Sequence, residues 1–156
     1  MAATEKKVSG ATRRARQMMV GGLVLGHAAG ITVLGLALVI GGTDAAITVA
    51  LGFAAVVIFF SVGQFIEIIA CELEPVQGMG LALVSYLVRV VGIGVGMYYI
   101  LYNPAVAPHV EGGWLLLSMV ATVIAWVGGV VLVASRQRVP IYDAEYVPPA
   151  AGGEGD

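Results

Sequence analysis

The chain has 156 residues, of which 59% are hydrophobic and 12% are charged, and its formal net charge is −2. Globular domains carry about 25% charged residues, and a soluble domain of this length could not cover so much apolar surface, so the composition excludes a water-soluble fold. The small net charge gives no indication of nucleic-acid binding, and the single cysteine, Cys71, excludes an internal disulfide and a multi-cysteine metal site.

Four long apolar runs follow one another along the chain and predict four transmembrane helices. They cover residues 18–40, 45–70, 80–102 and 113–135. Each run reaches the roughly 20 residues that an α-helix needs to cross about 30 Å of hydrocarbon. None of them alternates with period two, as the strands of a membrane barrel do. We therefore expect an all-α membrane protein whose four helices form two antiparallel hairpins.

Polar segments flank the predicted membrane domain, residues 18–138. Residues 1–17 are basic and predict a cytoplasmic segment that lies on the anionic inner leaflet or is disordered. Residues 139–156 are rich in proline, glycine and acidic side chains, which predicts a disordered tail. The turns at 41–44 and 103–112 contain no lysine or arginine, so the positive-inside rule predicts that both termini lie in the cytoplasm.

A charged residue, Arg89, lies within the third apolar run. Arginine at the centre of a membrane helix costs from about 2.5 to more than about 10 kcal/mol, so a partner is expected. Because Cβ vectors tilt toward a helix's N-terminus, Arg89 and Glu67 should lean toward each other from neighbouring antiparallel helices. We predict an Arg89–Glu67 ion pair, with Gln64 or Tyr86 as a second partner. The pair is either structural, with snorkelling of Arg89 to the inner headgroups as a variant, or a functional intramembrane site.

Glycines recur at close spacing on two of the predicted helices. Gly22, Gly26 and Gly30 follow one another at intervals of four residues, which places them on one face of the first helix. Gly92 and Gly96 have the same spacing on the third helix. Small residues in such rows let helix backbones approach closely in a membrane. They indicate either internal packing of the bundle or a docking face for a glycine-rich helix of a partner.

The remaining polar residues suggest little chemistry. His27, in the first half of the first helix, is expected to form a hydrogen bond across the bundle, with a ligand or proton-relay role as the alternative. Asp44, His109 and Glu111 lie on the predicted outer side without the spacing of metal ligands. No phosphate loop, nucleophile–base pair or thiol motif is present. We therefore expect the protein to be no enzyme and to bind neither a cofactor nor a metal.

The order of these features resembles the bacterial ATP synthase protein I family. The shared features are a short basic N-terminus, two membrane hairpins, a basic residue in the third helix ("SYLVRVVGIGVG") and a short charged tail, over residues 11–143. Arg89 is the one residue that matches a position of the family. The loop at 71–79 is acidic, whereas the family's loop is often basic. The resemblance implies an accessory protein of the bacterial plasma membrane that helps to assemble or stabilise the c ring of the rotary ATP synthase.

Three functions remain open at this point. The first is a non-enzymatic accessory or assembly protein that packs its helices against the c ring. The second is a small cation or proton-coupled transporter that uses Glu67 and Arg89, and it would need to form at least a dimer to enclose a pathway. The third is an anchor that recruits a soluble partner through the tail "RVPIYDAEYVPP". The expected partners are thus membrane lipid, ATP synthase membrane subunits and a second copy of the chain, and nucleic acid is not expected.

Overall fold

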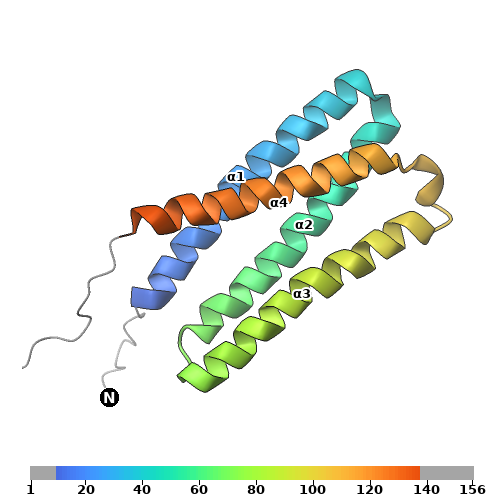
Figure 1. Cartoon of the computed structure of the whole chain (residues 1–156). Coiled ribbons are helices and arrows are strands. Elements are labelled where there is room, and N and C mark those ends of the chain that lie inside the picture. The colour runs from blue at the N-terminus through green and yellow to red at the C-terminus, as the bar shows by residue number, and fades with distance from the viewer. Residues whose placement is uncertain (1–9, 138–156) are drawn as a thin grey trace, which may run out of the picture.

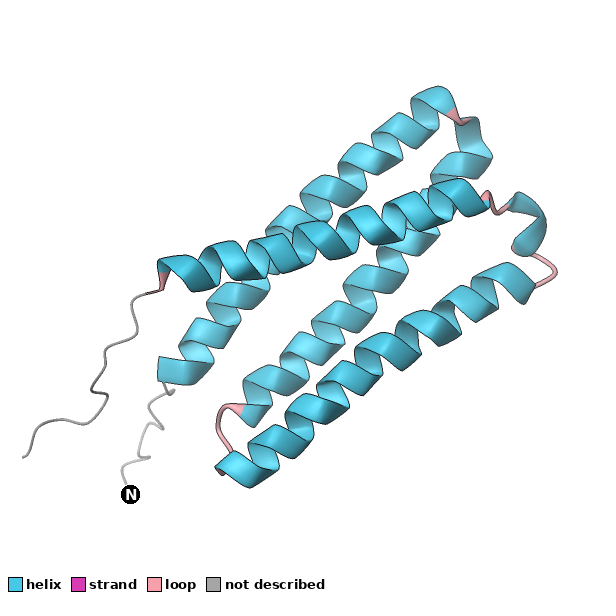
Figure 2. Cartoon of the chain, in the orientation of Figure 1, coloured by secondary structure: helices cyan, strands magenta, loops and turns pink. Residues whose placement is uncertain are grey.

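The computed structural model describes residues 10–137, which form four long helices (Figures 1 and 2). In chain order these are α1 (Gly10–Ile40), α2 (Gly42–Ala70), α3 (Pro75–Tyr102), the short 3₁₀ helix η1 (Ala107–His109) and α4 (Gly112–Arg136). The described residues contain no strand, so the predicted all-α fold is confirmed. All four long helices are long and apolar enough to cross a membrane. The chain therefore has the architecture of a multi-pass integral membrane protein.

All four helices begin earlier than the apolar runs predict, and the difference is largest for α1 and α3. α1 begins at Gly10 rather than at residue 18, so Arg13, Arg14 and Arg16 lie within it. α3 begins at Pro75 rather than at residue 80, because proline lacks an N–H and fits the first turn of a helix. The apolar runs predict where each helix crosses hydrocarbon, but they do not include the polar turns that extend it.

This earlier start changes the prediction for the N-terminal segment. Residues 10–17 are helical and continue into the membrane-spanning part of α1, so they are neither disordered nor a separate segment. Residues 1–9 and the predicted tail at 139–156 lie outside the described residues.

The turn between α1 and α2 is very short. Gly41 alone separates the two helices, and its N–H donates to the carbonyl of Ala37 at 2.8 Å. Gly42 has a φ of +80°, in the left-handed region that favours glycine because it lacks a Cβ. These two glycines reverse the chain at once, and α2 therefore packs back along α1 as an antiparallel hairpin (Figure 1).

The four helices form an incomplete bundle. α2 contacts each of the other three helices, and α4 crosses α1 in close contact (Figure 1). Within the described chain, no Cα atom of α3 lies within 8 Å of α1 or α4. α3 and α4 are joined by a short connection and share a core cluster through Ile100, Leu115 and Met119, but their backbones do not approach each other closely along their lengths, as a tightly packed second hairpin would require.

A buried hydroxyl explains why α4 leaves α3. Thr48 Oγ1 accepts a hydrogen bond from the backbone N–H of Glu111 at 3.1 Å. The same oxygen lies 2.8 Å from the carbonyl oxygen of Asp44 and 3.1 Å from that of His109. These contacts hold the α3–α4 connection against α2. As a result, α4 starts above α2 and runs across α1 instead of returning along α3 (Figure 1).

The packed core lies where α1, α2 and α4 meet. Its largest fully buried side chains include Val49, Val56, Leu115 and Trp126. α3 fully buries only Ser85 and Ile100, and most of its other large aliphatic and aromatic side chains lie on the surface. Such a surface suits a lipid environment, in which association of helices depends on close packing rather than on the hydrophobic effect.

Both ends of the described chain lie at the same end of the bundle as the α2–α3 turn (Figure 1). The side-chain amide of Gln137 donates to the carbonyl of Arg14 at 3.2 Å, which joins the end of α4 to the start of α1. Thr12 Oγ1 donates to the carboxylate of Glu72 in the turn. Two termini on one side agree with an even number of spans, and the assignment of that side to the cytoplasm stays a prediction of the positive-inside rule.

Candidate functional site

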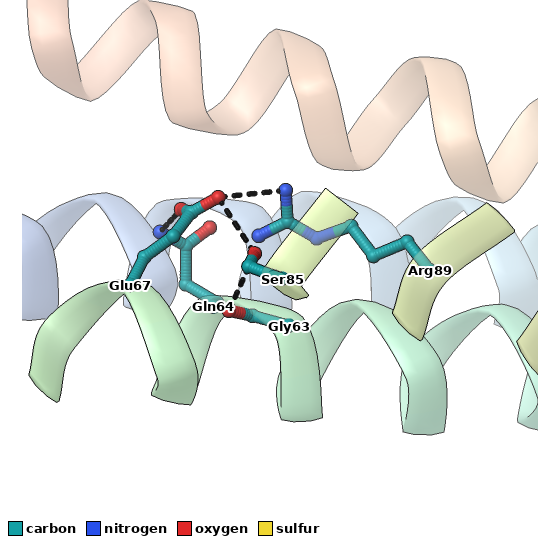
Figure 3. A network of polar contacts seen from close by, with 5 residues as sticks. All are labelled: Gly63, Gln64, Glu67, Ser85 and Arg89. Atoms are coloured by element: carbon teal, nitrogen blue, oxygen red, sulfur yellow. Dashed lines mark hydrogen bonds and ion pairs between the residues drawn. The ribbon is translucent and has the colours of Figure 1, made fainter. Parts of the chain in front are cut away.

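An ion pair connects α2 and α3, two helices that are long and apolar enough to cross a membrane (Figure 3). Arg89 Nη1 lies 2.9 Å from Glu67 Oε1, and the two side chains are 19% and 32% exposed. Arg89 stands near the middle of α3, whereas Glu67 belongs to the last turn of α2. The two side chains extend toward each other, which is the direction that the tilt of the Cβ vectors predicts (Figure 3). The structure therefore contains the predicted pair.

Two neighbouring side chains hold Glu67 in place. The amide of Gln64 donates to Glu67 Oε2 at 2.8 Å. Ser85 Oγ lies 3.0 Å from Glu67 Oε1 and 2.9 Å from the carbonyl oxygen of Gly63 (Figure 3). Both carboxylate oxygens are thus engaged by donors from two helices. The sequence analysis missed Ser85, although its position one helical turn before Arg89 places the two residues on the same face of α3.

Neither predicted second partner binds Arg89. Gln64 binds Glu67 instead, because it precedes that residue by one turn on the same helix. Tyr86 is 61% exposed, and its neighbour Ser85 occupies the face of α3 that meets α2, so the prediction for Tyr86 is wrong. The guanidinium instead lies over the ring of Phe60, with Cζ 5.5 Å from the ring centroid. This is the range of a cation–π interaction.

The guanidinium of Arg89 is only partly satisfied. Its Nε and Nη2 atoms are buried and have no hydrogen-bond partner within the described residues. Gly63 makes room for the side chain, since a Cβ at that position would collide with Nε. A buried donor without an acceptor costs about 1–3 kcal/mol, and more when it is charged. The pair is therefore closely held in space, but the guanidinium is incompletely hydrogen-bonded.

One cavity borders the ion pair, and a second is lined by residues further along the same helices. The first has a volume of about 190 Å³ and the second of about 210 Å³. The first is lined by Met18, Phe60, Gln64, Glu67, Arg89, Trp126, Val127 and Val130, and the second by Val56, Ile93, Met119, Val120, Val123 and Ile124.

The two cavities follow each other along the same helices. On α3 Ile93 is one turn from Arg89, and on α2 Val56 is one turn from Phe60. On α4, Val123 of one cavity is likewise one turn from Val127 of the other. We call these two cavities together the α3–α4 groove. They lie where the backbones of α3 and α4 stay apart.

The glycines predicted on α1 face the interior of the bundle. A Cβ at Gly22 would lie 2.7 Å from Trp126 Nε1, and one at Gly26 would lie 3.1 Å from Trp126 Cε3. A Cβ at Gly30 would collide with the ring of Phe53. All three glycines are buried. The sequence allowed either internal packing or a docking face for these three glycines, and the structure shows internal packing. Trp126 and Phe53 already cover this face of α1.

The glycines predicted on α3 also pack internally. A Cβ at Gly92 would collide with the ring of Phe59, and one at Gly96 would lie 3.4 Å from the same ring, at ordinary contact distance. By contrast, Gly94 has open space around the position of a Cβ. Gly92 therefore has the predicted packing role, and Gly96 has it more weakly. Both glycines pack against Phe59 of α2 rather than against a partner.

His27 does not form the predicted hydrogen bond across the bundle. Its Nδ1 atom lies 2.8 Å from the carbonyl oxygen of Leu23, one turn earlier on the same helix. The ring meets Phe53 of α2 edge-on, with 5.3 Å between the centroids. His27 therefore bonds to a carbonyl of its own helix, and the predicted hydrogen bond to a different helix is not formed.

The polar residues at the opposite end of the bundle do not gather into a site. Asp44 Oδ1 and His109 Nδ1 lie 3.4 Å apart, and both side chains are more than half exposed. Glu111 is the N-cap residue of α4, but its side chain makes no capping hydrogen bond. Within residues 10–137, no three His, Cys, Asp or Glu side chains are placed to hold a metal ion.

Comparisons of this protein with protein-family models, with curated proteins and with solved structures found no match. The resemblance to the ATP synthase protein I family therefore stays a prediction from the sequence. The observations that bear on function are the Arg89–Glu67 pair and the groove beside it.

Proposed function

We propose that this protein is a non-enzymatic accessory protein of a membrane complex, and that a transmembrane helix of its partner docks in the α3–α4 groove. The Arg89–Glu67 pair beside the groove carries this proposal. The pair lies within the membrane-spanning length, is partly exposed, and leaves two buried guanidinium nitrogens without an acceptor. Charge that faces hydrocarbon is costly. A helix laid over the groove would remove the pair from lipid, and its polar groups could accept from Arg89.

The packing of α3 supports the same proposal. The backbone of this helix closely approaches only α2 and η1, and the helix buries two residues, whereas α2 buries nine. Association of helices in a membrane depends on van der Waals contact between matching surfaces. The apolar part of the groove, between Ile93 on α3 and Val120 on α4, offers a concave surface of this kind. A docked helix would therefore gain contacts on both sides, which a flat helix face does not provide.

The partner that we propose is the membrane sector of the rotary ATP synthase, with its c ring as the contact surface. The support is the resemblance described above, including the basic residue at Arg89 in the third helix. The glycines of α1 give no support to this contact, because Trp126 and Phe53 already pack against them. We therefore assign the contact to α3 and α4 rather than to α1.

Affinity purification in a gentle detergent tests this function, followed by identification of the proteins that co-purify. Ile124 lines the groove and is 66% exposed, so Ile124→Trp should fill the groove without disturbing the core. Ile31→Trp on α1 is the matched control, because Ile31 is 63% exposed and lies outside the groove. Over-packing costs about 1–3 kcal/mol. We therefore expect Ile124→Trp to recover about tenfold less c subunit than the wild type, and Ile31→Trp to recover as much.

The outcomes separate the possible occupants of the groove. Recovery of no synthase subunit with the wild-type protein, from cells that make the enzyme, contradicts the proposed partner. A chain that is recovered with a second copy of itself, and loses that copy in Ile124→Trp, shows a homo-oligomer instead. Equal recovery with both tryptophan variants shows that the partner docks elsewhere on the surface.

Cation or proton-coupled transport is the second candidate function, because Glu67 and Arg89 line a cavity within the membrane-spanning length. The geometry favours it less, since Gln64, Ser85 and Arg89 already engage both oxygens of the Glu67 carboxylate. Ion flux into proteoliposomes separates the two functions. A flux that Glu67→Gln abolishes supports transport, whereas an accessory protein gives no flux in either form.

A further inference from the structure

One face of α1 changes from basic to aliphatic along its length. Arg13, Arg16 and Gln17 come first, and Val20 and Val24 follow at steps of three or four residues, which places all five on one side of the helix. Arg13 and Arg16 are exposed, and Val20 and Val24 are 58% and 61% exposed. This face therefore takes no part in the core that α1 shares with α2 and α4.

The same face borders a groove of about 620 Å³ between α1 and α4. Leu25 of α1 and Leu132 and Val133 of α4 complete its apolar walls. Gly21 and Gly129 form its floor, where the two backbones touch so closely that a Cβ at Gly129 would collide with the carbonyl of Gly21. We call this surface the α1–α4 groove. It shares no lining residue with the α3–α4 groove.

The basic end of the α1–α4 groove opens into a second cleft, of about 330 Å³. Arg13 and Gln17 line both, and Arg136 from the end of α4 lines the second. No aspartate or glutamate of the described chain lines either of them. The first turn of α1 adds the partial positive charge of a helix N-terminus. Positive charge therefore gathers at one end of an otherwise apolar groove.

We propose that the α1–α4 groove binds one anionic glycerophospholipid. Its phosphate lies between Arg13 and Arg16, and one acyl chain lies along Val20, Val24 and Leu132. The two arginines stand just before the apolar run that starts at residue 18, which is the depth of the phosphate groups of a leaflet. Basic pockets between transmembrane helices recognise anionic headgroups in this way. An amphipathic ligand of this class matches both the charge and the apolar length of the groove.

Native mass spectrometry of the purified full-length protein tests this inference, by titration with phosphatidylglycerol and with phosphatidylcholine of the same acyl chains. We expect phosphatidylglycerol to bind at least about tenfold more tightly. Arg13→Gln combined with Arg16→Gln should lower that affinity about thirtyfold, which corresponds to about 1 kcal/mol for each arginine. Arg13→Lys combined with Arg16→Lys keeps the charge and should keep most of the binding.

The groove itself is tested with a second pair of variants. Val24→Trp should fill the groove and lower the affinity with both arginines in place. Val39→Trp is its control, because Val39 is 85% exposed near the opposite end of α1. Val24→Trp with unchanged affinity shows that only surface charge attracts the headgroup, and this overturns the proposal.

Three further outcomes would also overturn it. Equal affinity for the two lipids would show that charge does not contribute to binding. Unchanged affinity in the double glutamine variant would show that the two arginines do not contribute. Competition by glycerol phosphate, which has no acyl chain, at the same concentration identifies a site for a free phosphate group rather than for a lipid. If the double glutamine variant does not fold, the comparison of the two lipids and the tryptophan variants still decide the matter.

Discussion

Arg89 is held from one side by Glu67 and from another by the ring of Phe60. Gly63 leaves no side chain in its path, and Ser85 fixes the carboxylate that it meets. These contacts fix the position of the guanidinium through an ion pair, a cation–π contact, a hydrogen bond and the lack of a side chain at Gly63. The site thereby joins α2 and α3.

Loss of the carboxylate charge should destabilise the protein. Glu67→Gln leaves the charge of Arg89 without a counter-ion in a site where its side chain is 19% exposed. Breaking a fully buried pair in this way costs about 3–5 kcal/mol. Because both side chains of this pair are partly exposed, we expect a smaller loss, about 1–3 kcal/mol in the free energy of unfolding. Unfolding in detergent, followed by circular dichroism, measures it.

Two control variants show whether the loss comes from the unpaired charge. Glu111→Gln changes an exposed carboxylate whose side chain makes no capping bond, and it should leave the stability unchanged. Replacing both partners, by Glu67→Leu with Arg89→Leu, should restore most of what Glu67→Gln loses, since no charge is left unpaired. A Glu67→Gln protein as stable as the wild type would show that the pair contributes nothing to the fold.

Among the elements, α1 and α4 form the tightest contact, because Gly21 and Gly129 let their backbones touch. Trp126 then fills the space beside Gly22 and Gly26 on the same pair of helices. A crossing of this kind depends on the absence of side chains at a few positions, since neither backbone can move aside without displacing the rest of its helix. The same geometry forms the floor of the α1–α4 groove.

Two neighbouring glycines of α4 offer a matched test of this crossing. In Gly129→Ala the new Cβ meets the backbone of Gly21, so we expect a loss of about 1–3 kcal/mol in the free energy of unfolding. In Gly128→Ala the Cβ meets open space, and the greater helix propensity of alanine should leave stability equal or raised by up to about 1 kcal/mol. Thermal unfolding of both variants in one detergent measures the difference. Equal melting temperatures would contradict the close crossing.

The whole molecule consists of a packed unit of α1, α2 and α4, to which α3 is attached mainly through α2. The ion pair lies at that attachment, and the α3–α4 groove is its open side. Both termini of the described chain and the α2–α3 turn lie at one end (Figure 1). The arginines of α1 and Arg136 lie at this end as well, which the positive-inside rule assigns to the cytoplasm.

The single cysteine provides a direct test of this orientation. Cys71 is exposed in the α2–α3 turn, so a membrane-impermeant maleimide should label it in inverted vesicles but not in intact cells. Thr43→Cys in a Cys71→Ser background places a thiol at the opposite end of α2 and should react in intact cells. Labelling of Cys71 in intact cells would reverse the assigned orientation.

The sequence by itself determined that the chain is helical and which four segments are long and apolar enough to cross a membrane. Each span must cover the hydrocarbon with its own residues and satisfy its backbone internally, so the number of helices depends on local composition alone. The Arg89–Glu67 pair was also predictable, because a short turn joins the two helices and the tilt of the Cβ vectors is a property of every α-helix.

Only the tertiary structure decided how the helices are arranged. The separation of α3 from α4, the anchoring of their connection by Thr48, and the supporting roles of Gly63 and Ser85 all depend on contacts between residues distant in sequence. The glycine row of α1 could have faced a partner or its own bundle, and the positions of Trp126 and Phe53 settled which. In a membrane every helix face is apolar, so hydropathy cannot distinguish a lipid-facing side from a packed one, and the fit of side chains across each crossing makes that choice.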